Sequence, residues 1–377
     1  FQGLMATRGY TVPEVETSLR RAEELCPRGA PGRYTITHGL WLRHLAGGDV
    51  WTSRAFAAEM IASAECETKP SAKVVAHLAL GMTCVFLGEH DAARDNLEAA
   101  LQMFNRDTHP EASLMMGADI EVFTSCYLAM TYWALGMADQ GERLVRRALE
   151  VAEELAHPFT RTVAASFASI HFQAQRQRLP TLEYTRRTHE LATEYGFSQY
   201  VTQSRIVSGW AQLEPHNAAS TIEAMATAID LRRSQGGLTA VPHYLAMLID
   251  AKLTTGDVDS AFRELDKAFV IMNKTGERVF APELHRLMGE AFIARGHRGD
   301  SDRAEDALLC ACEVAHYQNS RTQELRATLS LARFWRTVGN GSEGRQRLQR
   351  VLGRFSDAIN SPDVQEAQAF LAEEQSR

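Results

Sequence analysis

The sequence predicts an all-α protein: an α-solenoid in which about eight tetratricopeptide-like helix hairpins and a closing helix form one right-handed superhelix. Apolar residues recur at three- and four-residue spacing along most of the chain, which indicates amphipathic helices. Strict apolar–polar alternation, the pattern of strands, is nearly absent. A period of roughly 40 residues is marked by glycines that end one helix before a polar stretch that can cap the next. These turn glycines are Gly48, Gly88, Gly136, Gly256, Gly296 and Gly339.

The period fixes where the helices are expected. The first helix of each hairpin is predicted in these ranges: Ile36–Ala46, Ala72–Leu87, Ile120–Leu135, Thr160–Arg176, Ser198–Leu213, Thr239–Thr255, Ala281–Arg295 and Thr322–Val338. A second helix follows each of them. Glu14–Cys26 is expected to be a second helix without its partner. Ser361 and Pro362 supply a cap and a first-turn proline, so Asp363–Glu374 is predicted to close the array.

Two turns of the period lack a glycine. We expect them near residues 178–180 (Arg-Leu-Pro) and 214–216 (Glu-Pro-His), where proline and polar residues replace it. Four hairpins also share a small residue seven positions before the turn glycine, where a small side chain lets the second helix approach closely. These small residues are Gly81, Ala129, Gly289 and Ala332.

The chain is predicted to hold a single domain. No linker rich in Gly, Ser or Pro divides residues 5–377, and each repeat can bury its apolar face only against its neighbours. Residues 1–4 begin Phe1-Gln2-Gly3 and resemble the remnant of a protease-cleavable tag. The abrupt start into helical sequence predicts a fragment of a longer protein. The apolar stretches Val74–Gly88 and Phe123–Met137 fall short of the about 20 residues that a bilayer span needs, so we expect buried helices.

The composition is that of an ordinary soluble protein, with 45% hydrophobic and 23% charged residues among 377. The net charge of −7 argues against a protein that mainly coats nucleic acid or an acidic membrane, so neither is expected as a partner. Six cysteines show no C-x-x-C pair and no zinc-site spacing, which predicts reduced thiols, no metal site and a cytoplasmic location.

Several sequence blocks resemble a known family: "AHLALGMTCVFLGEHDAARDNLEAAL" (Ala76–Leu101), "LAHPF" (Leu155–Phe159), "TGERVFAPELHRLMGE" (Thr275–Glu290) and "ELRATLSLARFW" (Glu324–Trp335). Together they resemble the C-terminal tetratricopeptide-like repeat tail of bacterial adenylate-cyclase/AAA-type ATPase signalling proteins. The resemblance runs from about Gly9 to Ser361–Leu371 and departs from the family near residues 173–179 and 213–217. It implies a regulatory, partner-binding arm, because the phosphate-binding loop and cyclase carboxylates of that family lie in other domains.

No constellation for catalysis is visible in the sequence. Residues 339–344 spell G-x-G-x-x-G, but a dinucleotide site needs a strand before this motif and the preceding residues are helical in pattern. We therefore interpret it as a repeat turn. No nucleophile elbow, P-loop or H-E-x-x-H motif occurs. This fragment is predicted to be non-enzymatic and to need no cofactor, although a full-length parent could carry ATPase or cyclase activity.

The candidate binding residues follow from the hairpin register. In tetratricopeptide hairpins, fixed offsets from the small residue of the first helix line the concave face, an assignment carried over by resemblance. The matching positions are apolar near the start of the chain and charged near its end. The candidates are Met82, Met130, Trp133, Glu283, Arg286, Glu290, Arg326, Arg333 and Arg336. One interpretation is an internal ladder that pairs Glu283 or Glu290 with Arg326 or Arg333; the other is that the arginines recognise an acidic group.

Two functions remain open from the sequence. The first is a protein-interaction module that binds a protein or peptide segment, or other domains of its own polypeptide, along the concave face. The second is a repeat domain that senses a small molecule or nucleotide inside the superhelix. The arginine-rich segment Arg321–Arg354 is either a solvated face paired with acidic residues at positions 302, 305 and 306, or a docking patch for an acidic partner or nucleic acid.

Overall fold

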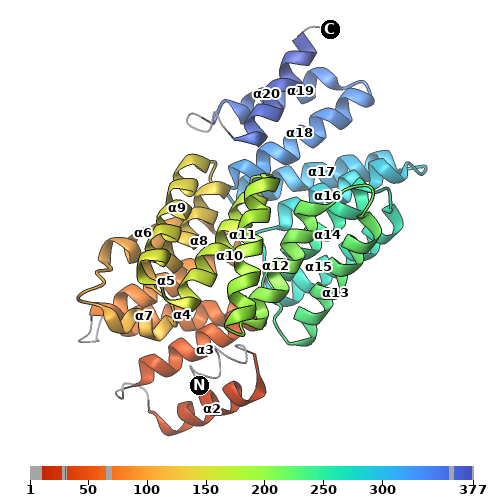
Figure 1. The fold of residues 1–377 in the computed structure, drawn as a ribbon. Coiled ribbons are helices and arrows are strands. Elements are labelled where there is room, and N and C mark those ends of the chain that lie inside the picture. Colours follow the sequence, from red (N-terminus) through yellow and green to blue (C-terminus); the bar gives the residue numbers. More distant parts are fainter. Residues whose placement is uncertain (1–10, 28–29, 31, 65–69, 356–360, 376–377) are drawn as a thin grey trace.

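The fold is an α-solenoid, as the sequence predicts. The computed structural model describes residues 11–27, 30, 32–64, 70–355 and 361–375, and over these residues every regular element is a helix. The prediction of a tag at residues 1–4 lies outside the described residues. In Figure 1 the helices around α4–α9 and those around α13–α17 flank α10–α12, and α18–α20 lie at the end where the chain finishes.

Eight hairpins make up the array. Their first helices are α3 (Arg33–Gly47), α5 (Pro70–Leu87), α8 (Ile120–Ala134), α10 (Pro158–Ala174), α12 (Ser198–Gln212), α14 (Val241–Thr254), α16 (Ala281–Arg295) and α18 (Arg321–Thr337). Their second helices are α4 (Val50–Ala64), α6 (His90–Met103), α9 (Ala138–Leu155), α11 (Arg178–Glu194), α13 (Ala218–Ser234), α15 (Val258–Thr275), α17 (Asp300–Tyr317) and α19 (Gly341–Leu352). The unpaired helix α2 (Pro13–Leu25) precedes them, and α20 (Pro362–Gln375) closes the array. The short helix α7 (Pro110–Met116) between α6 and α8 has no counterpart in the prediction.

In seven of the eight hairpins, the turn between the two helices has a left-handed residue; the turn between α12 and α13 has none. All six predicted turn glycines have φ between 64° and 94°, a conformation that costs glycine little. Of residues 339–344, the first two lie in such a turn and the rest begin α19; helix α18 precedes them where a dinucleotide site needs a strand. The turn expected at 178–180 in fact occupies residues 175–177, and Arg176 takes the left-handed place at φ 59°. The turn expected at 214–216 lies between α12 and α13, within residues 213–217.

The small residues allow close helix packing, as predicted. A Cβ atom added to Gly81 would lie 2.6 Å from Leu97 Cγ of α6, and one added to Gly289 would lie 2.6 Å from Leu308 Cγ of α17. Where the first helix carries Ala129, the glycine moves to the second helix, and a Cβ on Gly141 would lie 2.9 Å from the carbonyl oxygen of Ala129. Hairpins of this kind cannot accept larger side chains at these positions without a shift of one helix.

The superhelix closes on itself after about five repeats. Thr322 Oγ1 at the start of α18 donates to the carbonyl oxygen of Trp133 in α8 at 2.5 Å, although the two residues are 189 apart in sequence. The backbone N–H of Arg278 likewise donates to the carbonyl oxygen of Phe86 at 2.8 Å. Thr239 Oγ1 donates to the carbonyl of Leu45 from 194 residues away. The concave face is therefore an interior enclosed by two successive turns of the superhelix, and not an open groove.

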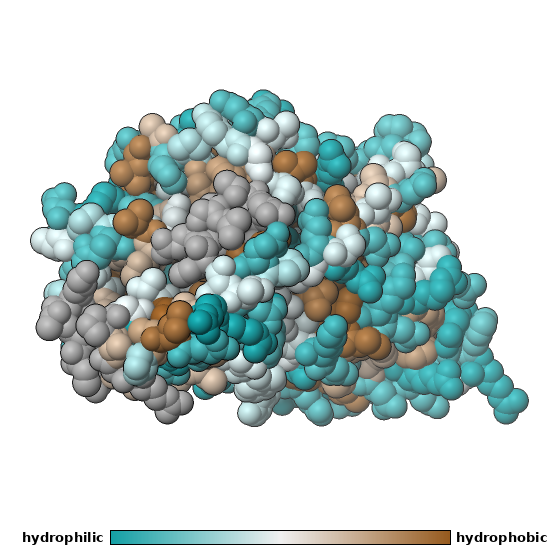
Figure 2. All heavy atoms as spheres, turned by 90° about the horizontal axis from the view of Figure 1, so that it is seen from below, coloured by the Kyte–Doolittle hydropathy of each residue, from teal (hydrophilic) through white to brown (hydrophobic). Residues whose placement is uncertain are grey.

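The described apolar residues lie mainly inside this closed array. Figure 2 shows one face of the molecule, on which the hydrophobic residues form small, separate groups among hydrophilic ones. Helix α5 is long and apolar enough to cross a membrane by length and composition, but 78% of that stretch is buried within the protein. Packing against its neighbours accounts for this composition, as the sequence analysis expects for Val74–Gly88.

Candidate functional site

Two cavities occupy the interior of the superhelix. The polar chamber, of about 390 Å³, is lined from α8, α10, α12, α14, α16, α18 and α20 and from the turns that join them. The apolar chamber, of about 150 Å³, is lined mainly from α3, α5, α8, α10, α12 and α14. His243 and Phe280 line both chambers, so the two cavities share a wall.

Arg326 of α18 is a buried cation of the polar chamber. Its guanidinium makes two hydrogen bonds to the Asp363 carboxylate of α20, at 2.6 and 2.8 Å, and it also donates to the carbonyl oxygen of Ala174. It lies 5.2 Å from the ring centre of Trp133. Burial alone lowers the pKa of Arg326, but the Asp363 carboxylate outweighs this and raises the pKa, so the group is permanently charged.

Arg286 of α16 is held within its own helix. It makes two hydrogen bonds to Glu283, at 2.9 and 2.7 Å, and lies 3.5 Å from both Glu290 and the hydroxyl of Ser330. Burial raises the pKa of Glu283, but the Arg286 guanidinium outweighs burial and lowers that pKa to about 2. Glu283 and Arg286 therefore form a charged, bidentate pair on the chamber wall.

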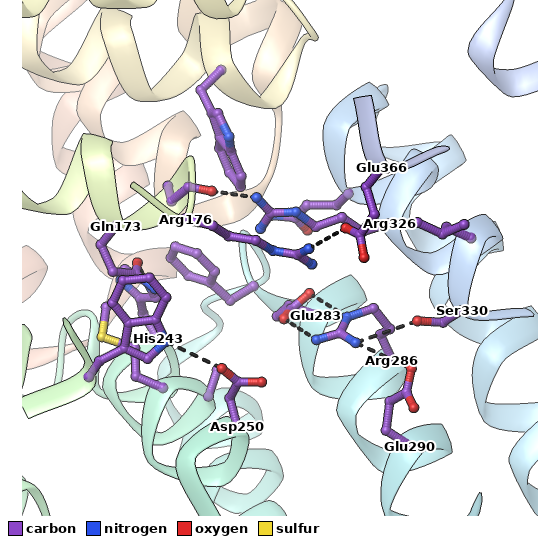
Figure 3. A pocket seen from close by; sticks show the side chains of 18 of the residues that line it. Gln173, Arg176, His243, Asp250, Glu283, Arg286, Glu290, Arg326, Ser330 and Glu366 are labelled. Carbon is purple, nitrogen blue, oxygen red and sulfur yellow. Dashed lines mark hydrogen bonds and ion pairs between the residues drawn. The ribbon is translucent and has the colours of Figure 1, made fainter. Parts of the chain in front are cut away.

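Arg176 and Arg333 share a single carboxylate. Arg176 Nη1 donates to Glu366 of α20 at 2.8 Å, and Arg333 Nη2 donates to the other oxygen of Glu366 at 2.9 Å. Arg176 also lies 3.8 Å from Asp363. Figure 3 shows Arg176 and Arg326 entering the same region of the chamber, with Glu366 beside them. We call Arg176, Arg326 and Arg333 the arginine pole.

The opposite side of the polar chamber carries carboxylates. Asp250 of α14 accepts a hydrogen bond from Trp210 Nε1 at 3.2 Å, and Arg178 lies 6.0 Å from the centre of the Trp210 ring. Within the part of the chain that the structure describes, Glu290 contacts Arg286 at 3.5 Å, and that arginine already pairs with Glu283. The Asp250 and Glu290 carboxylates thus lie away from the arginine pole, with Arg286 beside Glu290 (Figure 3).

The apolar chamber is lined largely by methionine and aromatic side chains. Met82, Met130 and Phe123 contribute to it, together with Tyr127, whose ring lies 4.8 Å from that of Phe167. Methionine side chains adapt their shape to what they contact, and this makes such a lining suitable for an apolar group.

The wall between the chambers is a stacked pair of rings. The centroids of His243 and Phe280 lie 3.9 Å apart and their planes differ by 3°. His243 Nε2 is 3.1 Å from the side-chain oxygen of Gln173 in α10, which fixes the imidazole. Burial lowers the pKa of His243 to about 3, so the ring is neutral at physiological pH.

The structure places eight of the nine predicted residues in these chambers. Met82 and Met130 line the apolar chamber, and the polar chamber contains the rest of the eight: Trp133, Glu283, Arg286, Glu290, Arg326 and Arg333. Arg336 lines neither chamber. It pairs with Glu373 at 3.7 Å and lies 4.7 Å from the ring centre of Phe370, because α20 covers it.

The predicted ladder across neighbouring first helices is wrong. Glu283 and Glu290 pair with Arg286 of their own helix, whereas Arg326 and Arg333 pair with the carboxylates of α20. The cause is that α20 packs against α18 and α19 as a further first helix of the array and brings its own acidic residues to the chamber.

The same helix corrects the interpretation of the arginine-rich segment. Within the described residues, Arg326, Arg333 and Arg336 pair with α20, and Arg354 pairs with Glu324 at 2.6 Å. The expected pairing with acidic residues 302, 305 and 306 does not form; Glu305 instead accepts from Trp335 Nε1 at 2.7 Å.

Sequence reasoning missed Arg176, His243, Phe280, Asp250 and Glu366. A signal for Arg176 was present, because it stands one period of about 40 residues after Gly136, at a place where the other turns use glycine. Asp250 and His243 could have been found by continuing the stripe of the first helices into α14. Nothing in the local pattern indicates that Glu366 faces the chamber.

No group of three or more His, Cys, Asp or Glu side chains that could hold a metal occurs in the described ranges. Of the six cysteines, the five that are described are free thiols. Burial raises the pKa of Cys84 to about 12, so that thiol is protonated and unreactive.

Comparison with known proteins supports the fold. No family model and no curated protein matches the chain. Among solved structures, a Rap protein complexed with Competence and Sporulation Factor matches with a TM-score of 0.55 at 12% identity, over 93% of this chain and 97% of that chain. The apo form of RapI has a TM-score of 0.47 at 13% identity, over 74% and 95% of the two chains. Aspartyl phosphate phosphatase F from Bacillus subtilis has a TM-score of 0.44 at 12% identity, over 96% and 93%. At 12% identity, the likeness to the first of these structures shows a shared arrangement of helices.

Proposed function

We propose that this chain is a non-enzymatic binding module whose two chambers hold a segment of a partner protein or of its own polypeptide. The observation that carries the proposal is the arginine pole. Three guanidinium groups line one cavity, in which Arg326 is buried and Arg176 and Arg333 are partly exposed, beside an apolar chamber that shares its wall. In ligand-binding sites, an apolar lining buries most of the ligand and a few polar or charged groups fix its orientation.

The resemblance to bacterial signalling ATPases and nucleotide cyclases supplies the context. In such a protein this cytoplasmic arm would act as a sensor or partner-binding element that controls the ATPase and effector domains. The first structural neighbour, of the same helical arrangement, is a Rap protein complexed with a factor. That complex supports a binding role for a superhelix of this kind.

A second candidate function is the sensing of a small molecule. The observation in its favour is that successive turns of the superhelix contact each other and enclose the interior. The volume of about 390 Å³ for the polar chamber falls within the usual range of small-molecule sites, about 300–1,000 Å³. An enclosed site of this size fits a compact ligand or the end of a chain better than the middle of a long helix.

A peptide-display selection tests the proposed function. Short random peptides are selected on the purified chain, and the enriched peptides are titrated against Glu290→Trp, which fills the polar chamber from a half-exposed position. Glu313→Trp, at an exposed site on α17, is the matched control. We expect binding to be lost with Glu290→Trp alone. Failure to enrich any peptide, or binding that survives Glu290→Trp, would contradict the proposal; a thermal-shift panel of small metabolites then tests the second candidate.

A further inference from the structure

The chambers differ in chemistry, and their sizes restrict what each can take. The apolar chamber, of about 150 Å³, matches the volume of an engineered apolar cavity that binds benzene, about 150 Å³. It can therefore hold one phenyl or branched alkyl group of about six carbons. The larger polar chamber leaves room for the rest of a ligand.

Within the arginine pole, the guanidinium groups outnumber the α20 carboxylates that pair with them, while Glu283 and Arg286 form a separate pair on the chamber wall. Three guanidinium groups face two carboxylates of α20, Asp363 and Glu366. Asp363 is engaged by both oxygens with Arg326, so Arg176 and Arg333 are left to divide Glu366 between them. Burial and the neighbouring guanidinium of Arg326 lower the pKa of Arg176, and they outweigh the opposite effect of Asp363 and Glu283.

Arg176 occupies a backbone conformation that favours glycine. Its φ of 59° costs an ordinary residue roughly 1–2 kcal/mol, and the corresponding turns of the other hairpins with a left-handed glycine avoid that cost. Strained residues of this kind are concentrated at functional sites. The strain places a guanidinium in the chamber where a glycine would leave none.

The arginine pole adjoins the wall between the chambers. Arg326 donates to the carbonyl oxygen of Ala174 at the end of α10. The preceding residue, Gln173, contacts His243 at 3.1 Å, and His243 stacks on Phe280, which lines both chambers. An anion at the arginines and an apolar group beyond Phe280 can therefore belong to one small ligand.

We propose that these chambers recognise a carboxylate attached to an apolar group of about six carbons, with the carboxylate at the arginine pole and the apolar group in the apolar chamber. This inference rests on the proposed function and names its ligand chemistry. The pole already binds two carboxylates: Arg326 holds Asp363 in the paired geometry that guanidinium groups prefer, and Arg176 and Arg333 each bind one oxygen of Glu366. The incoming carboxylate binds Arg333 and Arg176 in competition with Glu366. The same chemistry occurs at the C-terminus of a polypeptide that ends in Phe or Leu and in a free aryl- or alkyl-substituted acid.

Calorimetric titration of matched probes tests the inference on the unmodified chain. The probes are N-acetyl-Gly-Gly-Phe with a free carboxylate, its C-terminal amide, 4-phenylbutyrate and the neutral alcohol 4-phenylbutanol. We expect at least one acid to bind about tenfold more tightly than its neutral counterpart, which corresponds to about 1.4 kcal/mol. Tighter binding of the peptide acid identifies a polypeptide terminus as the source, and tighter binding of phenylbutyrate identifies a free acid. Equal affinities within both pairs, or no binding of any acid, would overturn the inference.

Variants connect the effect to the two chambers. Arg333→Met removes an exposed guanidinium of the pole, and Arg350→Met on the exposed face of α19 is the matched control. Arg333→Met should abolish the acid-over-neutral preference, whereas Arg350→Met should keep it. Met130→Trp, which fills the apolar chamber, should weaken all probes. A preference unchanged by Arg333→Met overturns the inference. The inference is also overturned if display-selected peptides bind in the chamber without needing a carboxylate, but that result leaves the proposed function intact. The proposed function is contradicted only if no selected peptide binds, or if binding survives Glu290→Trp.

Discussion

Arg176 donates a hydrogen bond to Glu366 at 2.8 Å across 190 residues of sequence, from the fourth hairpin turn to the closing helix. The contact joins a residue with a strained backbone to the closing helix, across the polar chamber that both residues line. Mutation can separate the free-energy cost of the Arg176 backbone conformation from the contribution of its ion pair with Glu366.

Arg176→Gly should leave the free energy of unfolding within about 1 kcal/mol of the parent. Glycine relieves the left-handed strain of about 1–2 kcal/mol, and the half-exposed ion pair that is lost contributes about 0–1 kcal/mol. Gly256→Arg is the matched control, because Gly256 has φ 81° with nothing near its missing Cβ, so this variant should lose about 1–2 kcal/mol from strain alone. Urea unfolding measures both. A large loss in Arg176→Gly would show that the arginine is retained for stability.

Gly289→Ala should destabilise the seventh hairpin by about 1–3 kcal/mol, because the new Cβ would lie 2.6 Å from Leu308 Cγ. Gly47→Ala at the end of α3 has no atom closer than 3.8 Å and should be neutral or slightly stabilising, as alanine usually is in a helix. Thermal unfolding compares the pair. Equal melting temperatures would contradict the packing described for α16 and α17.

Arg326→Met should cost about 3–5 kcal/mol of folding free energy, since it leaves the buried Asp363 carboxylate without its bidentate partner. Arg333→Lys should cost less than about 1 kcal/mol, because Arg333 is half-exposed and its pair with Glu366 is open to water. Chemical unfolding of both variants provides the comparison. Similar losses of folding free energy in the two variants would contradict the difference in burial between the two ion pairs.

Acid should destabilise the protein through its buried histidines. Burial lowers the pKa of His90 to about 4, and neither ring nitrogen has a hydrogen-bond partner. An unfolded histidine has a pKa near 6.5, so the unfolded chain binds more protons between about pH 4 and 6.5 and stability falls as the pH falls through that window. His90→Leu should make the stability less dependent on pH there. An unaltered acid profile would show that His90 is solvated.

Glu277 should act with the opposite sign. Burial raises its pKa to about 8, partly offset by the backbone N–H of Ala240, and an unfolded glutamate has a pKa of about 4.3. The folded chain binds the extra proton between these values, so this group's contribution to stability is full below about pH 4.3 and is lost as the pH rises through about 8. Glu277→Gln keeps an acceptor for Ala240 and should remove that loss. Stability curves of parent and variant that stay parallel from pH 6 to 9 would refute the burial effect.

The helical order and the chamber lining follow from sequence to different degrees. Gly81 and Gly289 mark helix contacts through local spacing, and the six turn glycines set the hairpin register, so a regular period predicts both. The pairing of Arg326 with Asp363 depends on the total rotation of the superhelix. That rotation is the sum of small rotations over many repeats, so local spacing in the sequence does not predict the pair. Helix α7 escaped prediction for a simpler reason, because it lies in an insertion outside the period.

The contacts between Thr322 and Trp133, and between Arg278 and Phe86, also change how the chain should unfold. An open array behaves as a one-dimensional series in which each repeat is stabilised only by its two neighbours, and its ends fray independently. Here each of the early hairpins also contacts a hairpin about 190 residues later in the sequence. A repeat is therefore stabilised by the next turn of the superhelix as well as by its two neighbours in sequence. Deleting the last hairpins should therefore loosen α8, in the first half of the chain, as well as the new end. The repeats are then expected to unfold as one cooperative unit.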